Sequence, residues 1–366
     1  MKILYYFGDD GTYMTRWQLD HFIDELKHHE VEFEFFNPLV YSSIDEANEK
    51  LIERLRNLGD IDCFMNAGPS TILYCETMAT LSKVDIPKLL ICFDNLHAPY
   101  MHKDIMPYFD LVWLTSRENE EKIKSWGVNT IFLPYAANPY KFIVSDNNED
   151  VQRVCFIGSP YGTRCVKFNQ LVQNGIPCDV FCGGKSRKNT VTKEKNSFED
   201  VIIKFKNYFG SSIGMRLFVS NMMSKVRKPQ LDTGNEYLRL FNSLEFSEMT
   251  KKYHEYSLSL NITEVWNTLL LSNPIYKLHL RTFEIPMSGG IEFTTYNEEV
   301  ANYFEEDKEM VFYRSEEEYI DKAHYYLDDK RKELRERIKV AARKRAEKDH
   351  TWWNRFSVVF DQLGIK

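Results

Sequence analysis

Short apolar runs alternate with helix-like stretches along the first 140 residues, and this alternation restricts what the chain can fold into. Each run has the length of a strand, and each longer stretch between runs has apolar residues at helical spacing. Such alternation predicts a parallel sheet with helices on both faces, a doubly wound α/β domain. The runs expected as strands are 2–7, 31–36, 61–65, 88–93, 111–114 and 130–133, and the stretches expected as helices are 13–28, 44–57, 70–81 and 117–126.

A second alternation begins after a polar, turn-rich segment at 145–150, which has the composition of a linker. We therefore predict two Rossmann-like domains, at 1–140 and 151–350, and a helix at 351–366 that packs back toward the first domain. Ligands of doubly wound sheets bind at the carboxyl ends of the strands, so the two halves are expected to enclose a cleft. The second set of expected strands is 153–157, 178–181, 257–262, 291–295 and 310–313, with a helix at 163–173 and a charged helical region at 316–348.

The stretch 185–228 interrupts the second alternation. It holds eleven Lys or Arg against three acids, a net charge of +8 in a chain whose net charge is −7. Its apolar residues recur at helical spacing, so we interpret 185–240 as a basic amphipathic insertion. The insertion either docks peripherally on an anionic membrane or packs its apolar residues on the second domain. The apolar residues in question are Val201, Ile202, Phe205, Phe209 and Leu217.

Composition excludes several classes of protein. The modest excess of acid over base makes a nucleic-acid partner unlikely for the surface as a whole. No run approaches the roughly 20 apolar residues of a membrane span, and the apolar start is too short for a secretory signal. The seven cysteines lack zinc-ligand spacing, so we expect reduced thiols, no metal, no cofactor and a cytoplasmic location.

The segment from His279 to Gly290 carries the strongest signal of a binding site. Its pattern predicts a loop, a short helix, two glycines and a strand. Amide groups at a helix start attract phosphate, and a carboxylate one turn into the helix, here Glu284, can accept the hydroxyls of a ribose. The alternative is a plain helix with a glycine cap, in which Glu284 is a surface residue.

Residues 281–290 resemble the Arg-Thr-Phe-Glu-x-Pro-x-x-Gly-Gly hallmark of the CgeB-like (spore maturation protein) glycosyltransferases. The segments 309–313 and 350–355 resemble the ending of that family. The segment 156–164 resembles the opening of its second domain, and 257–261 its central strand. The resemblance implies a GT-B fold, in which two doubly wound Rossmann-like domains face a central cleft, and a nucleotide-sugar donor bound by the second half.

The resemblance further implies that Glu284 binds the ribose of the donor. Many GT-B enzymes carry a Glu-x7-Glu pair here, but Tyr276 stands eight residues before Glu284, so the pair is absent. In a site without a metal ion, cationic side chains must stabilise the negative charge that develops on a diphosphate leaving group. The candidates are Arg164, then Arg281, then Lys277 and His279, with Thr282 in the same segment and a Gly158-Ser159 turn that allows the ligand close to the backbone.

Two loops in the first half follow predicted strands. Gly8, Asp9 and Gly11 come after the first strand, where they line the cleft or merely form a tight turn. Asp94 and His97 come after another strand, and either could act as the general base toward an acceptor hydroxyl. The alternative is that Asp94 caps the next segment and His97 is a polar loop residue.

These observations predict a metal-independent glycosyltransferase that moves a sugar from a nucleotide-sugar to a hydroxyl-bearing acceptor. A glycan or a lipid-linked glycan would suit such an enzyme, as in polysaccharide biosynthesis. Two alternatives stay open: a nucleotide-sugar 2-epimerase of the same architecture, and a nucleotide-sugar-binding protein without catalytic activity.

Overall fold

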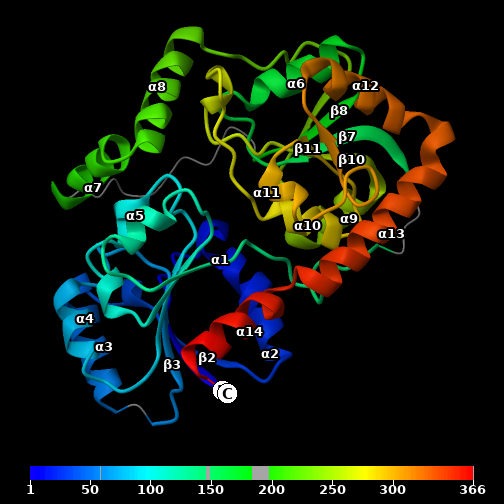
Figure 1. Cartoon of the computed structure of the whole chain (residues 1–366). Helices are drawn as coiled ribbons and strands as arrows, with labels where there is room; N and C mark the ends of the chain where they lie inside the picture. Colours follow the sequence, from blue (N-terminus) through cyan, green and yellow to red (C-terminus); the bar gives the residue numbers. More distant parts are fainter. Residues whose placement is uncertain (58, 146–148, 184–197, 366) are drawn as a thin grey trace. The chain divides into compact units, whose positions relative to one another are not determined.

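The computed structural model describes residues 1–57, 59–145, 149–183 and 198–365, and the chain divides into two compact units (Figure 1). Among the described residues, the first unit comprises 1–134, 198–215 and 352–365, and the second comprises 135–145, 149–183 and 216–351. Each unit is built on one six-stranded sheet in which all neighbouring strands are parallel. The expectation of two doubly wound α/β halves is therefore confirmed.

The sheet of the first unit has the order β2-β1-β3-β4-β5-β6. Every residue of β3, β4 and β5 is buried, as expected for parallel strands that are covered on both faces. All six predicted strands are present, with ends that differ by at most two residues. Their bounds are β1 Lys2–Tyr6, β2 Glu32–Phe36, β3 Cys63–Asn66, β4 Lys88–Cys92, β5 Leu111–Leu114 and β6 Thr130–Phe132.

The helices of the first unit are shorter than predicted. The expected helix 13–28 is divided by a π-turn at Leu19–Ile23, in which His21 leaves helical backbone angles. The expected helix 70–81 begins only at Cys75. The reason is that the Asn48 amide accepts from the N–H of Tyr74 and donates to the carbonyl of Ile72, which holds that backbone outside the helix. The helices are α1 Tyr13–Gln18, α2 Asp24–Lys27, α3 Ile44–Arg56, α4 Cys75–Leu81 and α5 Glu120–Lys124.

The helix α14, Trp352–Leu363, belongs to the first unit and is fixed there at its first turn. The buried carboxylate of Glu25 accepts hydrogen bonds from the N–H groups of Trp352, at 3.0 Å, and Trp353, at 2.8 Å. The Trp352 ring is fully buried, and its N–H donates to Nδ1 of His21. Trp352 is therefore part of the core of the first unit, whereas Trp353 is half-buried.

The sheet of the second unit has the order β12-β11-β10-β7-β8-β9. Five of its strands match the prediction, whereas β9 and the helices α9 and α11 were not predicted. β9 lies at the sheet edge with three of its four residues exposed, so it lacks the apolar run that marks the buried strands. The strands are β7 Val151–Ile157, β8 Cys178–Phe181, β9 Leu238–Phe241, β10 Tyr256–Asn261, β11 Glu292–Thr295 and β12 Val311–Tyr313.

The strand order creates a switch point in the second unit. The chain runs from β7 outward to β8 and β9, then returns to the other side of β7 for β10. Connections leave β7 and β10 in opposite directions, and sheets of this kind bind their ligands at the carboxyl ends of the strands at such a point. The helices of this unit are α6 Arg164–Gln173, α9 Phe246–Glu255, α10 Arg281–Met287, α11 Glu298–Ala301, α12 Glu316–Leu327 and α13 Lys332–Asp349.

Two helices occupy the described part of the predicted insertion. They are α7, Phe198–Phe209, and α8, Ser212–Arg227 (Figure 1), while 185–197 lie outside the described residues. The first unit includes α7, and the division between the units falls within α8. Among the described residues, no helix combines the length and the apolar character that crossing a bilayer requires.

The contact between Glu25 and α14 leads to a prediction about stability. Glu25→Ala leaves two buried N–H groups without their acceptor, so we expect the free energy of unfolding to fall by about 2–3 kcal/mol. Glu25→Gln keeps one acceptor oxygen and should lose less. Glu49→Ala, at an exposed position of α3, is the matched control. Urea denaturation followed by tryptophan fluorescence measures the three values; equal stability of the Glu25→Ala and Glu49→Ala variants would contradict the assignment.

Candidate functional site

The turn after β7 is the centre of the candidate site. The N–H of Gly158 donates to the carbonyl of Phe181, and its backbone has φ +147, in the region that favours glycine. A Cβ atom at this position would lie 2.4 Å from Nη2 of Arg281. The backbone angle therefore favours glycine, and the absence of a Cβ atom lets the arginine side chain lie directly against the backbone.

Two arginines from different helices meet at this turn. Arg281 is the first residue of α10, and its Nε donates to the carbonyl of Ile157 at 2.9 Å. Arg164 is the first residue of α6, only 7% exposed, and its Nη1 donates to the carbonyl of Ser159 at 3.0 Å. The Arg164 guanidinium lies 4.2 Å from the ring centroid of Tyr161. The structure thus brings together Gly158, Ser159 and both arginines.

Two positive charges lie close together at the turn, and the nearest acidic side chains act on them only over a longer distance. Within the described parts of the chain, neither arginine forms an ion pair with a carboxylate. Burial, and then the neighbouring Arg281, lower the pKa of Arg164 to about 10, so Arg164 remains cationic at neutral pH. Burying cations without a counter-charge is unfavourable. An anion with two phosphates would balance the two charges at this turn.

A buried hydrogen-bond network supports the other side of the site. The Asn261 amide, at the end of β10, donates to the hydroxyl of Thr282 at 3.1 Å and to Glu292 at 2.9 Å. It thereby joins β10, β11 and α10. Burial raises the pKa of Glu292 to about 8, so this carboxyl is largely neutral at pH 7. Neither Asn261 nor Glu292 was predicted as a site residue; the polar end of a buried strand was the available signal.

Glu284 is the fourth residue of α10 and lies one turn beyond Arg281. The expected order of loop, short helix, glycines and strand is observed. Glu284 is 4% exposed, so the alternative that it is a surface residue is wrong. Thr282 is fully buried, and its oxygen accepts from Asn261, which gives it a part in joining strand to helix.

Lys277 lies on the segment that returns toward the end of β10. Its N–H donates to the carbonyl of Thr263 at 2.9 Å, next to the bridge between Glu264 and Tyr276. Its ammonium group lies 5.8 Å from the ring centroid of Tyr135. The carbonyl of His279 accepts from the N–H of Thr282 at the start of α10.

The loop after β1 in the first unit is closed by its own side chains. The carboxylate of Asp9 accepts from Arg16 at 2.9 Å and from the N–H of Gly11 at 2.8 Å. The hydrogen bond from Arg16 lowers the pKa of Asp9. Gly11 has φ +77, while Gly8 lies beside the side chains of Ile72 and Leu39. These contacts favour the tight-turn interpretation of this loop.

Asp94 and His97 are close together after β4. The carboxylate Oδ1 of Asp94 lies 3.6 Å from Nε2 of His97, and the carbonyl of Asp94 accepts from Ala98. The Asp94 side chain is 49% exposed and that of His97 is 19% exposed. A carboxylate beside an imidazole can orient the ring and support proton transfer.

Comparison with solved structures shows which architecture this is. Anabaena HepE, in complex with UDP and glucose, has a TM-score of 0.58 at 10% identity, over 100% of this chain and 99% of that chain. Sucrose-phosphate synthase from Thermosynechococcus elongatus has a TM-score of 0.58 at 10% identity, covering 99% and 98%. A glycosyltransferase from Rickettsia africae has a TM-score of 0.57 at 8% identity, covering 99% and 98%. The chain has the GT-B fold.

Sequence comparison adds a likeness in the second half of this GT-B chain. Residues 226–361 match a family described as glycosyl transferase-like. This region contains β10, the Arg281 and Glu284 segment, and the helices α10 to α13. No match was found among the curated proteins. The finer resemblance to the CgeB-like family stays a prediction.

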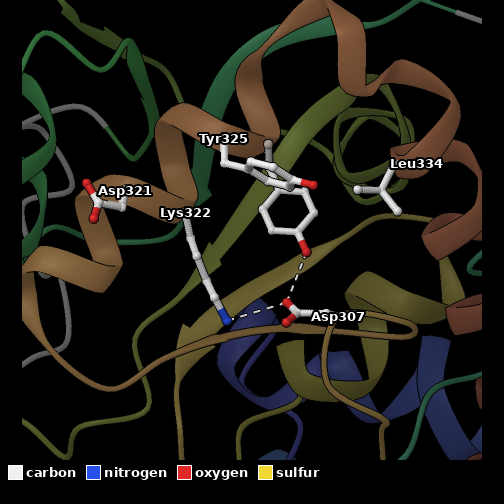
Figure 2. A pocket seen from close by; sticks show the side chains of 6 residues that line it. Asp307, Asp321, Lys322, Tyr325 and Leu334 are labelled. Carbon is white, nitrogen blue, oxygen red and sulfur yellow. Dashed lines mark hydrogen bonds and ion pairs between the residues drawn. The ribbon is translucent and has the colours of Figure 1, made fainter.

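A hollow in the second unit of the GT-B chain is lined by none of the residues at the Gly158 turn (Figure 2). It adjoins the amino end of the edge strand β12, the opposite end from the ligand-binding edge of the sheet. Its cation, Lys322, is balanced by Glu306 at 3.2 Å and Asp307 at 3.4 Å, and the Tyr326 hydroxyl donates to Asp307. Lys322 therefore forms ion pairs with carboxylates, which Arg164 and Arg281 do not among the residues that the structure describes. Its lining residues are Asp307, Asp321, Lys322, Tyr325, Tyr326 and Leu334.

The close approach at Gly158 leads to a prediction about anion binding. In Gly158→Ala the new methyl group displaces the Arg281 guanidinium, so we expect the affinity for pyrophosphate to fall at least about tenfold, or about 1.4 kcal/mol. Gly127→Ala is the control, because Gly127 has φ +76 but no atom within 4 Å of its Cβ position. That variant also places alanine at a positive φ, and it should lose stability only. Calorimetric titration that finds equal pyrophosphate affinity in both variants would refute the role of the turn.

The raised pKa of Glu292 leads to a prediction about pH. The folded state holds a proton that the unfolded state releases between pH 4.5 and about 8, so stability falls as pH rises through this window. Glu292→Gln keeps an acceptor for Asn261 and removes the ionisation. We expect the variant to gain stability over the unaltered chain from pH 5 to 8, by on the order of 3 kcal/mol. Denaturation curves at several pH values test this; a stability difference that does not change with pH would contradict it. The exposed Glu298→Gln is the control.

Proposed function

We propose that the chain is a glycosyltransferase that uses a nucleotide-sugar donor bound at the switch point of the second unit. The observation that carries the proposal is the pair of arginines at Gly158, which form no ion pair with a carboxylate among the described residues. A nucleoside diphosphate supplies two negative charges to such a site. The match of residues 226–361 to a glycosyl transferase-like family supports the same assignment.

The donor chemistry follows from these positions. As the bond between sugar and diphosphate breaks, negative charge grows on the leaving group, and Arg164 and Arg281 stabilise it. The guanidiniums are held by backbone carbonyls and the ring of Tyr161, so they need not reorganise during the reaction. Glu284, one turn further along α10, accepts the ribose hydroxyls. The complex of Anabaena HepE with UDP supports a uridine nucleotide as the first donor to test.

The acceptor is assigned to the first unit. Asp94 and His97 lie 3.6 Å apart at the carboxyl end of β4, and we assign them the removal of the acceptor hydroxyl proton. A glycan or a lipid-linked glycan is the proposed acceptor. The described residues hold no group of three or more His, Cys, Asp or Glu placed to bind a metal ion. The two arginines supply positive charge at the diphosphate, and we propose that transfer is metal-independent.

The donor site is tested by a thermal-shift panel of nucleotide-sugars, followed by calorimetry, with EDTA present throughout. A donor at a hundred times its dissociation constant adds roughly 2.7 kcal/mol of stability and so stands out in the panel. Glu284→Ala should weaken that donor by about 1.5–3 kcal/mol, or about 10- to 150-fold, because it removes hydrogen bonds to a charged group. Glu298→Ala, an exposed glutamate at the start of α11, should bind normally.

The outcomes separate the proposal from its alternatives. Unchanged donor affinity in Glu284→Ala would refute the ribose assignment. Binding that requires manganese would refute the metal-independent account. Donor turnover to the 2-epimer without any acceptor would identify an epimerase. Donor binding with neither transfer nor epimerisation would identify a binding protein.

A further inference from the structure

The helix α7 exposes a row of apolar side chains. Val201, Phe205 and Phe209 are spaced four residues apart, so they lie on one face of the helix. Their exposed fractions are 52%, 63% and 46%. The expectation that these three residues pack on the second domain is therefore wrong. Of the five residues in that expectation, Leu217 is buried and Ile202 is partly buried.

The helix α8 exposes a second apolar row. Its members are three or four residues apart, so they also share one helix face. Their exposed fractions range from 39% to 82%, and the most exposed is Val226. Leu217 and Ser220 are buried, so the helix packs by one side and exposes the other. The row consists of Met215, Phe218, Val219, Met222 and Val226.

All charged side chains in the stretch that carries both rows are basic. From 201 to 231 the chain contains no Asp or Glu. This absence leaves a net charge of +6 over the stretch, within a chain of net charge −7. The basic residues are Lys204, Lys206, Arg216, Lys225, Arg227 and Lys228.

The position of α7 is fixed by polar contacts on its other side. The amide oxygen of Asn207 accepts from the N–H of Tyr100 at 3.0 Å. The carbonyl of Gly210, just after the helix, accepts from the hydroxyl of Tyr100 and from the ammonium group of Lys122. The ammonium groups of Lys122 and Lys103 lie 4.9 and 5.7 Å from the ring centroid of Tyr100. These contacts orient the helix and add two cations beside it.

We infer that α7 and α8 dock on the surface of an anionic membrane. Each helix combines an exposed apolar row with basic neighbours, the pattern that lets a helix lie in the headgroup region. If two copies of the chain paired through these apolar rows, the basic residues of one copy would lie close to those of the other and repel them. A nucleic acid would use the cations but leave the apolar rows in water. The membrane is the occupant that satisfies both features, and this docking is independent of the proposed transfer reaction.

Flotation with vesicles of defined composition tests this inference. We expect the protein to bind vesicles of phosphatidylglycerol and phosphatidylcholine, and not vesicles of phosphatidylcholine alone, with binding weakened by salt. Lys225→Glu with Arg227→Glu should reduce the partition coefficient at least about 25-fold, since each basic residue contributes about fivefold. Phe205→Ser with Phe209→Ser should reduce it about tenfold or more.

Matched variants on α13 serve as controls. Lys344→Glu with Lys348→Glu changes the net charge equally, and Val340→Ser removes an equally exposed apolar side chain. Both should leave vesicle binding unchanged, and all variants should keep the donor affinity of the unaltered chain, which shows that they are folded.

Three results would overturn the inference. One is failure to bind anionic vesicles at low salt. Another is equal binding to neutral vesicles. The third is a change of oligomeric state or of oligonucleotide binding in the α7 and α8 variants while vesicle binding persists. Because donor affinity is measured on the same samples, loss of docking is distinguishable from failure of the donor assignment.

Discussion

The guanidinium groups of Arg164 and Arg281 bind backbone carbonyls on either side of Gly158, and the candidate site depends on these two contacts. Each arginine begins a helix, α6 or α10, so the contacts attach both helices to the end of β7. Under the proposed function, these two cations at the switch point of the sheet bind the diphosphate of the donor.

The strands were predictable because a parallel sheet covered on both faces demands continuous apolar runs. Lys88–Cys92 and Leu111–Leu114 are such runs, and their bounds could be predicted to within a residue. β9 could not be predicted, because an edge strand with exposed side chains lacks this signal. The start of α4 could not be predicted either, since Asn48, 26 residues earlier than Tyr74, decides it through a contact that only the folded chain creates.

Some residues of the candidate site could be chosen from the sequence, and others could not. Gly158, Arg164 and Arg281 could be chosen because glycine turns and arginines near strand ends are visible in the sequence. The pairing of Asn261 with Glu292 was not, because it depends on the register between β10 and β11. For Asp9 the sequence pattern was typical of a cleft loop. In the structure its carboxylate accepts hydrogen bonds from Arg16 and from an N–H group of its own turn.

The attachment of α14 to the first unit has a consequence for the order in which the molecule can be completed. Phe22 and Trp113 of the first unit lie against Trp352 and Phe356 of α14, and these partners follow the whole second unit in the chain. A ribosome therefore releases residues 1–134 long before it makes the helix that covers them. Until then, the aromatic face of the first unit is open to chaperones or to misassociation. The time needed to synthesise the second unit is therefore the shortest time for which the aromatic face of the first unit stays uncovered by α14.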